Sequence, residues 1–293
     1  MPRCRIESLG ISPPPGPPFG RGSLAHALRA GRACLEGSCY HPEDVRVLVN
    51  AGVHRDEHVC EPAIAAYVQR GLGINVEFQG RRTLAFDLLN GGCGMLNAAH
   101  VVSGLLLAGE AQVGMVVASE ANSDRRPDPE YRYPPSGAAL MLDLSPRETL
   151  GFGSFAFHTH EEHAELYTSV VSLKVPRGKL LLRRQAELES IYLEKARAVV
   201  DEVLERDRLR REEIALVVPA QLSPGFLARL PEAIGFGRGQ LADYSDRLED
   251  TLTTSVFLAM DEARRTAGLK PGAHLLLLAF GSGVTVAAAS YRL

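Results

Sequence analysis

The spacing of apolar residues changes repeatedly along the chain between short continuous runs, typical of buried strands, and a period of three to four residues, typical of helices. The most regular block predicts a strand at 82–88, a glycine-rich turn, an apolar helix at 95–107 and a second buried strand at 112–119. This strand–helix–strand order is that of a βαβ unit, so we expect a parallel sheet.

The same alternation continues on both sides of this block. We expect further helices at 23–35, 61–71, 180–206, 226–235 and 251–268, and strands at 4–12, within 41–53, and at 137–144, 151–158, 214–218, 274–280 and 284–291. Residues 12–23 and 123–135 are too rich in proline or charge for either element and are predicted to be loops. The pattern therefore predicts an α/β protein.

Two stretches of similar size, residues 1–150 and 151–293, each carry this alternation and each end in a pair of strands. We interpret them as two halves of an internal duplication, although no repeat is detectable in the sequence itself.

Composition narrows the function classes. The chain has 293 residues, of which 45% are hydrophobic and 23% are charged, and its net charge is −3. Such a balance gives no reason to expect a nucleic-acid partner. The longest apolar runs, 101–109 and 275–280, fall short of the roughly 20 residues that a membrane helix needs, and residues 1–5 do not resemble a signal peptide. We expect a cytoplasmic protein.

Five cysteines all lie within the first 93 residues. An odd number without paired Cys-x-x-Cys spacing argues against a disulfide framework or a zinc ribbon. One of them, Cys93, lies at the start of the apolar helix, and by itself this position is typical of a small buried residue.

Four stretches together resemble the thiolase superfamily, and within it the ketoacyl-ACP synthase III branch. They occur in the family's order and approximate spacing: AFDLLNGGCGMLNAA at 85–99, EIALVVPAQ at 213–221, SDRLEDTLTTSVFLAMDEA at 245–263 and LLLLAFGSGVT at 275–285. The resemblance implies a thiolase-like, five-layered αβαβα fold with two duplicated halves.

The resemblance also implies a function. The family acts on acyl groups held as thioesters on coenzyme A or acyl carrier protein, usually as a homodimer, and needs no metal or other cofactor. A cysteine at a helix start takes the acyl group, while a His and an Asn stabilise the carbanion and oxyanion of a decarboxylative condensation. Donors placed in advance at a developing oxyanion are a large catalytic contribution.

This chain departs from the family's pattern at all three positions. The family His falls on Ala220 and the family Asn on Asp250. An alanine side chain forms no hydrogen bond and an ionised aspartate only accepts, so the usual decarboxylating pair is absent. Counted without a gap from Asp87, the family Cys falls on Gly92, and Cys93 comes one residue later. One residue is about 100° of rotation on a helix.

The candidate site therefore consists of Cys93 as nucleophile and Asp250 as general base. Glu249 is a second candidate base, because adjacent carboxylates near an apolar pocket raise one another's pKa; the alternative is a solvated acidic turn. The predicted pocket and oxyanion positions are glycines: Gly92, Gly94, Gly281 and Gly283.

Three histidines, His158, His160 and His163, lie close together in FHTHEEHAEL. A metal ion would accept such ligands. We favour a solvated loop, because polar residues after a strand are ordinarily exposed, and we predict no metal site.

Three functions remain open. The first is an acyl-thioester acyltransferase of the synthase III type in fatty-acid-like or polyketide metabolism, with Cys93 acylated and Asp250 as base toward a hydroxyl or amine. The second is a catalytically degenerate subunit that pairs with an active synthase. The third is a thioester hydrolase. In the family, a segment at the place of the proline-rich stretch 12–23 contacts coenzyme A. Because this chain lacks that segment, we expect an acyl carrier protein as donor as well as acyl-CoA.

Overall fold

A computed structural model describes residues 2–14, 22–76, 82–147, 149–174 and 178–293. Most of the loop predicted at 12–23 lies outside these residues.

The amino-terminal half alternates strands and helices as expected. Its elements are β1 (Cys4–Ser12), α1 (Ser23–Glu36), β2 (Val47–Asn50), α2 (Ile64–Leu72), β3 (Leu84–Asp87), α3 (Gly94–Leu107), β4 (Val113–Glu120) and β5 (Ser136–Leu144). The predicted βαβ unit is present as β3, α3 and β4. Strand β2 lies between β3 and β4 in the sheet and pairs in parallel with both.

The carboxy-terminal half has a similar order. Its elements are β6 (Gly151–Thr159), β7 (Tyr167–Ser172), β8 (Lys179–Arg184), α4 (Leu188–Asp207), β9 (Ile214–Pro219), α5 (Pro224–Ile234), α6 (Ser255–Thr266), β10 (His274–Gly281) and β11 (Thr285–Arg292). Two short 3₁₀ turns, Gly91–Cys93 before α3 and Leu252–Thr254 before α6, begin the two central helices.

The two main sheets have matching strand orders. The first is β1-β5-β4-β2-β3 and the second is β6-β11-β10-β9. Where the first sheet has β3, the second has a single parallel bridge between Val217 and Leu241. Equivalent strands thus occupy equivalent places, as the predicted duplication requires. The boundary at residue 150 remains a prediction.

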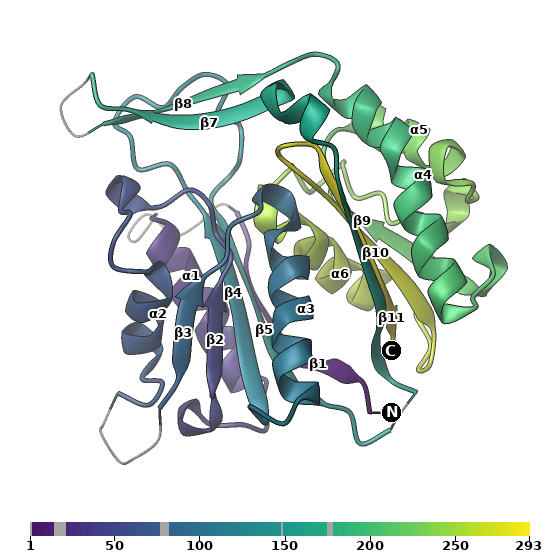
Figure 1. The fold of residues 1–293 in the computed structure, drawn as a ribbon, viewed down its shortest axis with the longest axis horizontal. Helices are drawn as coiled ribbons and strands as arrows, with labels where there is room; N and C mark the ends of the chain where they lie inside the picture. Colours follow the sequence, from purple (N-terminus) through teal and green to yellow (C-terminus); the bar gives the residue numbers. More distant parts are fainter. Residues whose placement is uncertain (1, 15–21, 77–81, 148, 175–177) are drawn as a thin grey trace.

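The layers follow from which helices contact which sheet (Figure 1). Helices α1 and α2 cover the outer face of the first sheet, α3 and α6 lie between the two sheets, and α4 and α5 cover the outer face of the second. This is the expected five-layered αβαβα architecture. Helix α3 is apolar on nearly all sides; most of it is buried between the two sheets, while His100, Val101, Gly104 and Leu107 are exposed along one side. No helix in the described ranges is both long and apolar enough to cross a membrane.

One secondary-structure prediction was wrong. Residues 180–206 were expected to form a single helix, but 179–184 form β8, which pairs antiparallel with β7. Tyr167 pairs with Arg184 at the base of this hairpin, and Val171 pairs with Leu180 near its tip. A run such as KLLLRR fits either element, and strand pairing decided it. The hairpin crosses the end of the molecule where α3 begins (Figure 1).

Candidate active site

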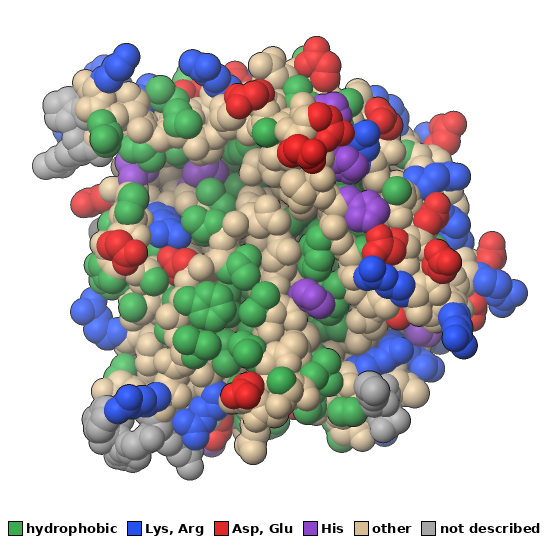
Figure 2. All heavy atoms as spheres, viewed as in Figure 1, with side chains coloured by type: hydrophobic (Ala, Val, Ile, Leu, Met, Phe, Trp, Pro, Cys, Tyr) green, Lys and Arg blue, Asp and Glu red, His purple; other side chains and the backbone are tan. Residues whose placement is uncertain are grey.

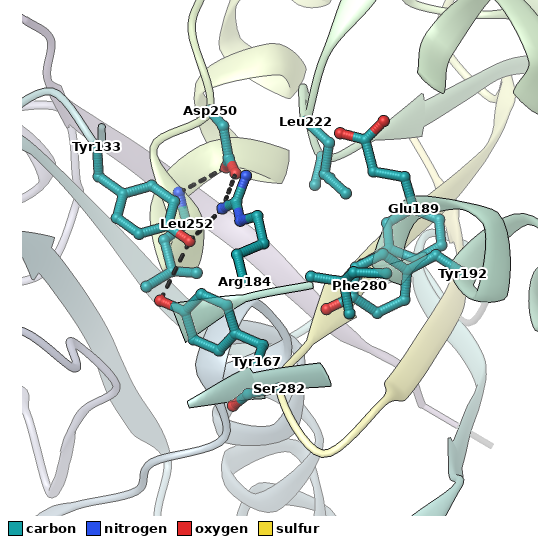
Figure 3. Close-up of a pocket in the computed structure, with 12 residues that line it drawn as sticks. Tyr133, Tyr167, Arg184, Glu189, Tyr192, Leu222, Asp250, Leu252, Phe280 and Ser282 are labelled. Atoms are coloured by element: carbon teal, nitrogen blue, oxygen red, sulfur yellow. Dashed lines mark hydrogen bonds and ion pairs between the residues drawn. The ribbon is translucent and has the colours of Figure 1, made fainter. Parts of the chain in front are cut away.

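A narrow pocket lies between the β7–β8 hairpin, the start of α4 and the ends of β9 and β10 (Figure 3). It is lined by Tyr133, Tyr167, Arg184, Leu188, Glu189, Tyr192, Ala220, Leu222, Asp250, Leu252, Phe280 and Ser282. Its space, open mouth included, is about 410 Å³, but only about 20 Å³ admits the centre of a water molecule. A bound group therefore has to be small or has to displace side chains.

Asp250 is the acidic group at the centre of this pocket. One of its carboxylate oxygens accepts the backbone N–H of Leu252 at 2.8 Å, and the other lies 3.9 Å from Nη2 of Arg184. Leu252 has a left-handed backbone (φ 54°), a strained conformation for a branched side chain. The tight turn at Leu252 thus aims its N–H at the carboxylate.

Burial raises the pKa of Asp250 to about 6. The Leu252 N–H and the Arg184 guanidinium act against this rise, while the charges of Glu120 and Glu189 add to it. A carboxyl group with this pKa changes charge close to neutral pH, as a general base at working pH should.

Arg184 supplies the positive charge of the pocket. It donates a hydrogen bond of 2.6 Å to the hydroxyl of Tyr133, which in turn donates to the hydroxyl of Tyr167 at 3.2 Å. The guanidinium lies over both rings, 5.5 Å from the centre of Tyr133 and 5.8 Å from that of Tyr167. Figure 3 shows it held between the two tyrosines and below Asp250.

Cys93 lies behind the wall of the pocket, with its sulfur facing Gly281: a Cβ placed on Gly281 would lie 3.2 Å from it. Its side chain is fully buried in the core, and its thiol donates to the carbonyl oxygen of Thr285 at 3.4 Å. Burial raises the pKa of this thiol well above its usual range. Cys93 is not among the residues that line the pocket. Its acylation remains a prediction, and this geometry does not favour it.

Gly92 is closed in by backbone. A Cβ placed on it would lie 2.2 Å from the carbonyl oxygen of Phe280, so no larger side chain fits without a shift of the chain. On Gly94 a Cβ would lie 3.0 Å from the carbonyl oxygen of Ala51. These two glycines allow the close packing of the turn before α3, and neither lines the pocket.

The other predicted positions divide between pocket and surroundings. Ala220 lines the pocket, and its short side chain leaves room beside Asp250. Gly281 accepts a hydrogen bond of 2.9 Å from the hydroxyl of Tyr192, while Gly283 has the left-handed backbone (φ 74°) of the turn between β10 and β11. Glu249 is exposed and does not line the pocket.

The histidine cluster contacts glutamate side chains. Nε2 of His158 lies 2.5 Å from Glu202, and His160 and His163 each lie 3.7 Å from Glu162. Among the described residues, no group of three or more His, Cys, Asp or Glu side chains is placed to hold a metal ion.

The pocket thus offers a carboxyl that can take a proton and nearby N–H and O–H groups that can stabilise negative charge. It has no thiol. This set suits attack on a carbonyl by a nucleophile that the pocket deprotonates.

Known proteins with similar sequences share one description. A family model for the C-terminal part of 3-oxoacyl-[acyl-carrier-protein] synthase III matches residues 204–293. Beta-ketoacyl-[acyl-carrier-protein] synthase III of Pectobacterium atrosepticum is 28% identical over 271 residues, which are 90% of this chain and 82% of the relative. That of Sodalis glossinidius is 29% identical over 238 residues, 79% and 72% of the two chains.

Solved structures agree on the fold. The synthase III of Thermus thermophilus superposes with a TM-score of 0.84 at 23% identity, covering 99% of both chains. The priming beta-ketosynthase of the R1128 polyketide pathway also gives 0.84, at 17% identity, covering 99% of this chain and 96% of that one. The chain is thus similar in sequence to ketoacyl-ACP synthase III over most of its length, and it shares the thiolase-like fold of the solved synthases.

In this synthase III-like chain, the site residues that the sequence did not reveal are Arg184 and Tyr133. Arg184 was placed in a helix and Tyr133 in a surface loop. Two β-rich runs, 167–172 and 179–184, on either side of the sequence Pro-Arg-Gly were the signal for the hairpin. A tyrosine between charged residues and prolines gave no comparable signal.

We expect Cys93 of the synthase III-like protein to resist alkylation. In native protein at pH 8, iodoacetamide should label the exposed Cys39 and Cys60, while Cys93 stays unmodified because its thiol is buried and protonated. Peptide mass spectrometry measures this, and labelling in denaturant, where all five cysteines react, is the control. Labelling of native Cys93 at the rate of Cys39 would contradict the buried placement.

We also expect the Asp250→Asn variant to be more stable than the wild type at pH 7. A raised pKa means that the folded protein holds the proton more tightly, so stability falls as pH rises from about 4 to about 6. The variant avoids this loss, which is at most about 3 kcal/mol. Urea unfolding at pH 4 and pH 7 measures the difference, with exposed Asp246→Asn as control. An equal difference at both pH values would count against the raised pKa.

Proposed function

We propose that the chain is an acyl-thioester acyltransferase of the ketoacyl-ACP synthase III type whose chemistry depends on Asp250 rather than on an acylated cysteine. The observation that carries this proposal is the partly buried carboxyl of Asp250, whose side chain is 15% exposed, beside Arg184 in a pocket that no thiol lines. The names of the relatives support an acyl group carried on acyl carrier protein.

The reaction follows from the placement of the groups. Asp250 takes the proton of an acceptor hydroxyl or amine as its oxygen or nitrogen attacks the thioester carbonyl. Arg184 and the nearby tyrosine hydroxyls donate to the oxygen that gains negative charge. The new C–O or C–N bond forms, the C–S bond breaks, and the thiol of the carrier leaves with the proton from Asp250. With water as the acceptor the same steps give hydrolysis.

The narrow space favours a short acyl group. It is smaller than most ligand pockets in the part that water can enter, and Tyr192, Phe280 and Leu222 close its inner side. A short acyl group, carried on acyl carrier protein or on coenzyme A, is therefore the substrate that fits without rearrangement.

The test uses acetyl-CoA and acetylated carrier protein as donors, hydroxylamine or water as acceptor, and thiol release as readout. We expect Asp250→Asn to lower the rate about 100-fold or more, because a general base contributes on that scale. Cys93→Ala and the surface variant Asp246→Asn should stay within about threefold of wild type. Intact mass should show no acylated protein.

Two results would contradict the proposal. An acyl adduct that disappears in Cys93→Ala would instead support a covalent mechanism through Cys93. An absence of thiol release with every donor would leave the second candidate, a subunit that pairs with an active synthase. That candidate is favoured by Gly92, since the family's nucleophile position here has no room for a side chain.

Assembly is a separate part of the proposal. Strand β3 is an edge strand, paired only with β2 among the described strands. Exposed apolar residues lie on and near β3 and on α3: Leu84, Leu89, Val101 and Leu107. Figure 2 shows apolar side chains gathered on this face. We propose that a second copy of the chain covers it, since an unpaired edge and an apolar patch favour association.

Light scattering should therefore give twice the chain mass of 31.7 kDa. Leu84→Arg should shift the protein to the monomer, because it places a charge on the apolar edge, while Leu173→Arg, at an exposed apolar residue beside β7, should leave the dimer intact. A wild-type monomer that associates only with an active synthase would support the heterodimer instead.

A further inference from the structure

Glu120, the last residue of β4, is fully buried at the junction of the two halves. Its carboxylate accepts the backbone N–H groups of Val53 and His54, each at 3.0 Å, and Nδ1 of His54 lies 2.8 Å away. The hydroxyl of Thr253 donates to it at 2.7 Å. A buried carboxylate with this many partners is held firmly in one position.

The bond to Thr253 connects Glu120 to the turn that carries Asp250. Thr253 lies in the 3₁₀ turn Leu252–Thr254, and Leu252 of the same turn donates its N–H to Asp250. Thr253 is fully buried, so water does not replace a lost bond easily. Glu120 thereby fixes the segment that aims the Leu252 N–H at the Asp250 carboxylate.

His54 connects the same carboxylate to the β7–β8 hairpin. Its Nε2 lies 3.2 Å from the hydroxyl of Ser169 in β7, two residues after Tyr167, which is the cross-strand partner of Arg184. The imidazole also packs edge-on against Tyr131 and is stacked on Tyr133. One network thus contacts both elements that bring charge to the pocket.

We propose that Glu120 is a positioning residue that ties the Asp250 turn to the hairpin carrying Arg184 and so sets the separation of these two groups. This inference rests on the proposed role of Asp250. The charged side chains that line the pocket, Arg184, Glu189 and Asp250, all come from the second half of the chain. The proposed role of Glu120 means that the first half helps to position them.

The charge of Glu120 and its hydrogen bonds act on the pKa of Asp250 in opposite directions. Several other groups surround Asp250: Arg184 from β8, Tyr167 from β7, Tyr133 from the loop before β5, and Glu189 and Tyr192 from α4. Glu120 and Glu189 raise the pKa of Asp250, while the Leu252 N–H and Arg184 lower it. Loosening of the turn, with the charge of Glu120 kept, should therefore raise that pKa, because the groups that stabilise the carboxylate are less well placed.

The test is a carbon-13 NMR titration of protein with labelled aspartate carboxyls, in which Asp250→Asn identifies the Asp250 signal. In Thr253→Val we expect the pKa of Asp250 to rise by about half a unit or more, because the turn that presents the Leu252 N–H loosens while the charge of Glu120 stays; in Glu120→Gln the loss of that charge opposes the rise. Ser136→Ala is the matched control, because it removes a buried hydroxyl bond of 2.8 Å to Thr254 of the same turn and leaves the hydrogen bonds of the Glu120 carboxylate in place. Its titration should match the wild type.

The inference is overturned if Thr253→Val shifts the pKa of Asp250 no more than Ser136→Ala does. That comparison stands even where Glu120→Gln does not fold, since Thr253→Val keeps the buried charge. The titration needs no turnover, so it separates this inference from the proposed function. A raised pKa in Thr253→Val together with full thiol release in Asp250→Asn would support the positioning by Glu120 and reject Asp250 as the base.

Discussion

A carboxyl group enclosed by protein has to be protonated, hydrogen-bonded or paired, because its charged form loses water that nothing else replaces. Asp250 meets this constraint with one backbone N–H and one guanidinium at a loose 3.9 Å. That partial compensation leaves its pKa near 6. The arrangement of the pocket follows from it, since the Leu252 turn, the hairpin and the tyrosines around Arg184 all hold these two groups in place.

The same constraint applies to the thiol of Cys93, whose charged form would also need a partner in the core. Cys93 is buried without a cation to stabilise a thiolate, and the position before it is sealed by the Phe280 carbonyl. A nucleophile at Gly92 would require the turn between β3 and α3 to move away from β10. With Ala220 in place of a histidine, the polar chemistry of the pocket comes instead from Asp250 and the residues of the hairpin.

The layered fold could be predicted from the sequence because it depends on apolar periodicity and on the order of four motifs, both of which are local. The matching sheet orders of the two halves agree with that prediction. The hairpin could not be separated from a helix, since KLLLRR satisfies both patterns and only its pairing with β7 decides. Arg184 was missed for this reason.

The site residues were harder to place than the fold. The sequence identified Asp250, but its partial burial depends on Tyr133 and Tyr167, which come from distant segments. The direction of Cys93 depends on a one-residue offset in a glycine turn, where φ is not restricted by a side chain. Glu120 gave no signal at all, because a single acidic residue at the end of a strand is ordinarily exposed.

The central claim is that a carboxyl, not a thiol, drives the chemistry of this pocket. The pH dependence of thiol release from acetyl-CoA in the Cys93→Ser variant tests it most directly. We predict a rate that rises with pH through one step near pH 6, as in the wild type, because Asp250 must lose its proton to act. A rate abolished in Cys93→Ser, or a step displaced to the thiol range above about pH 8, would contradict the account.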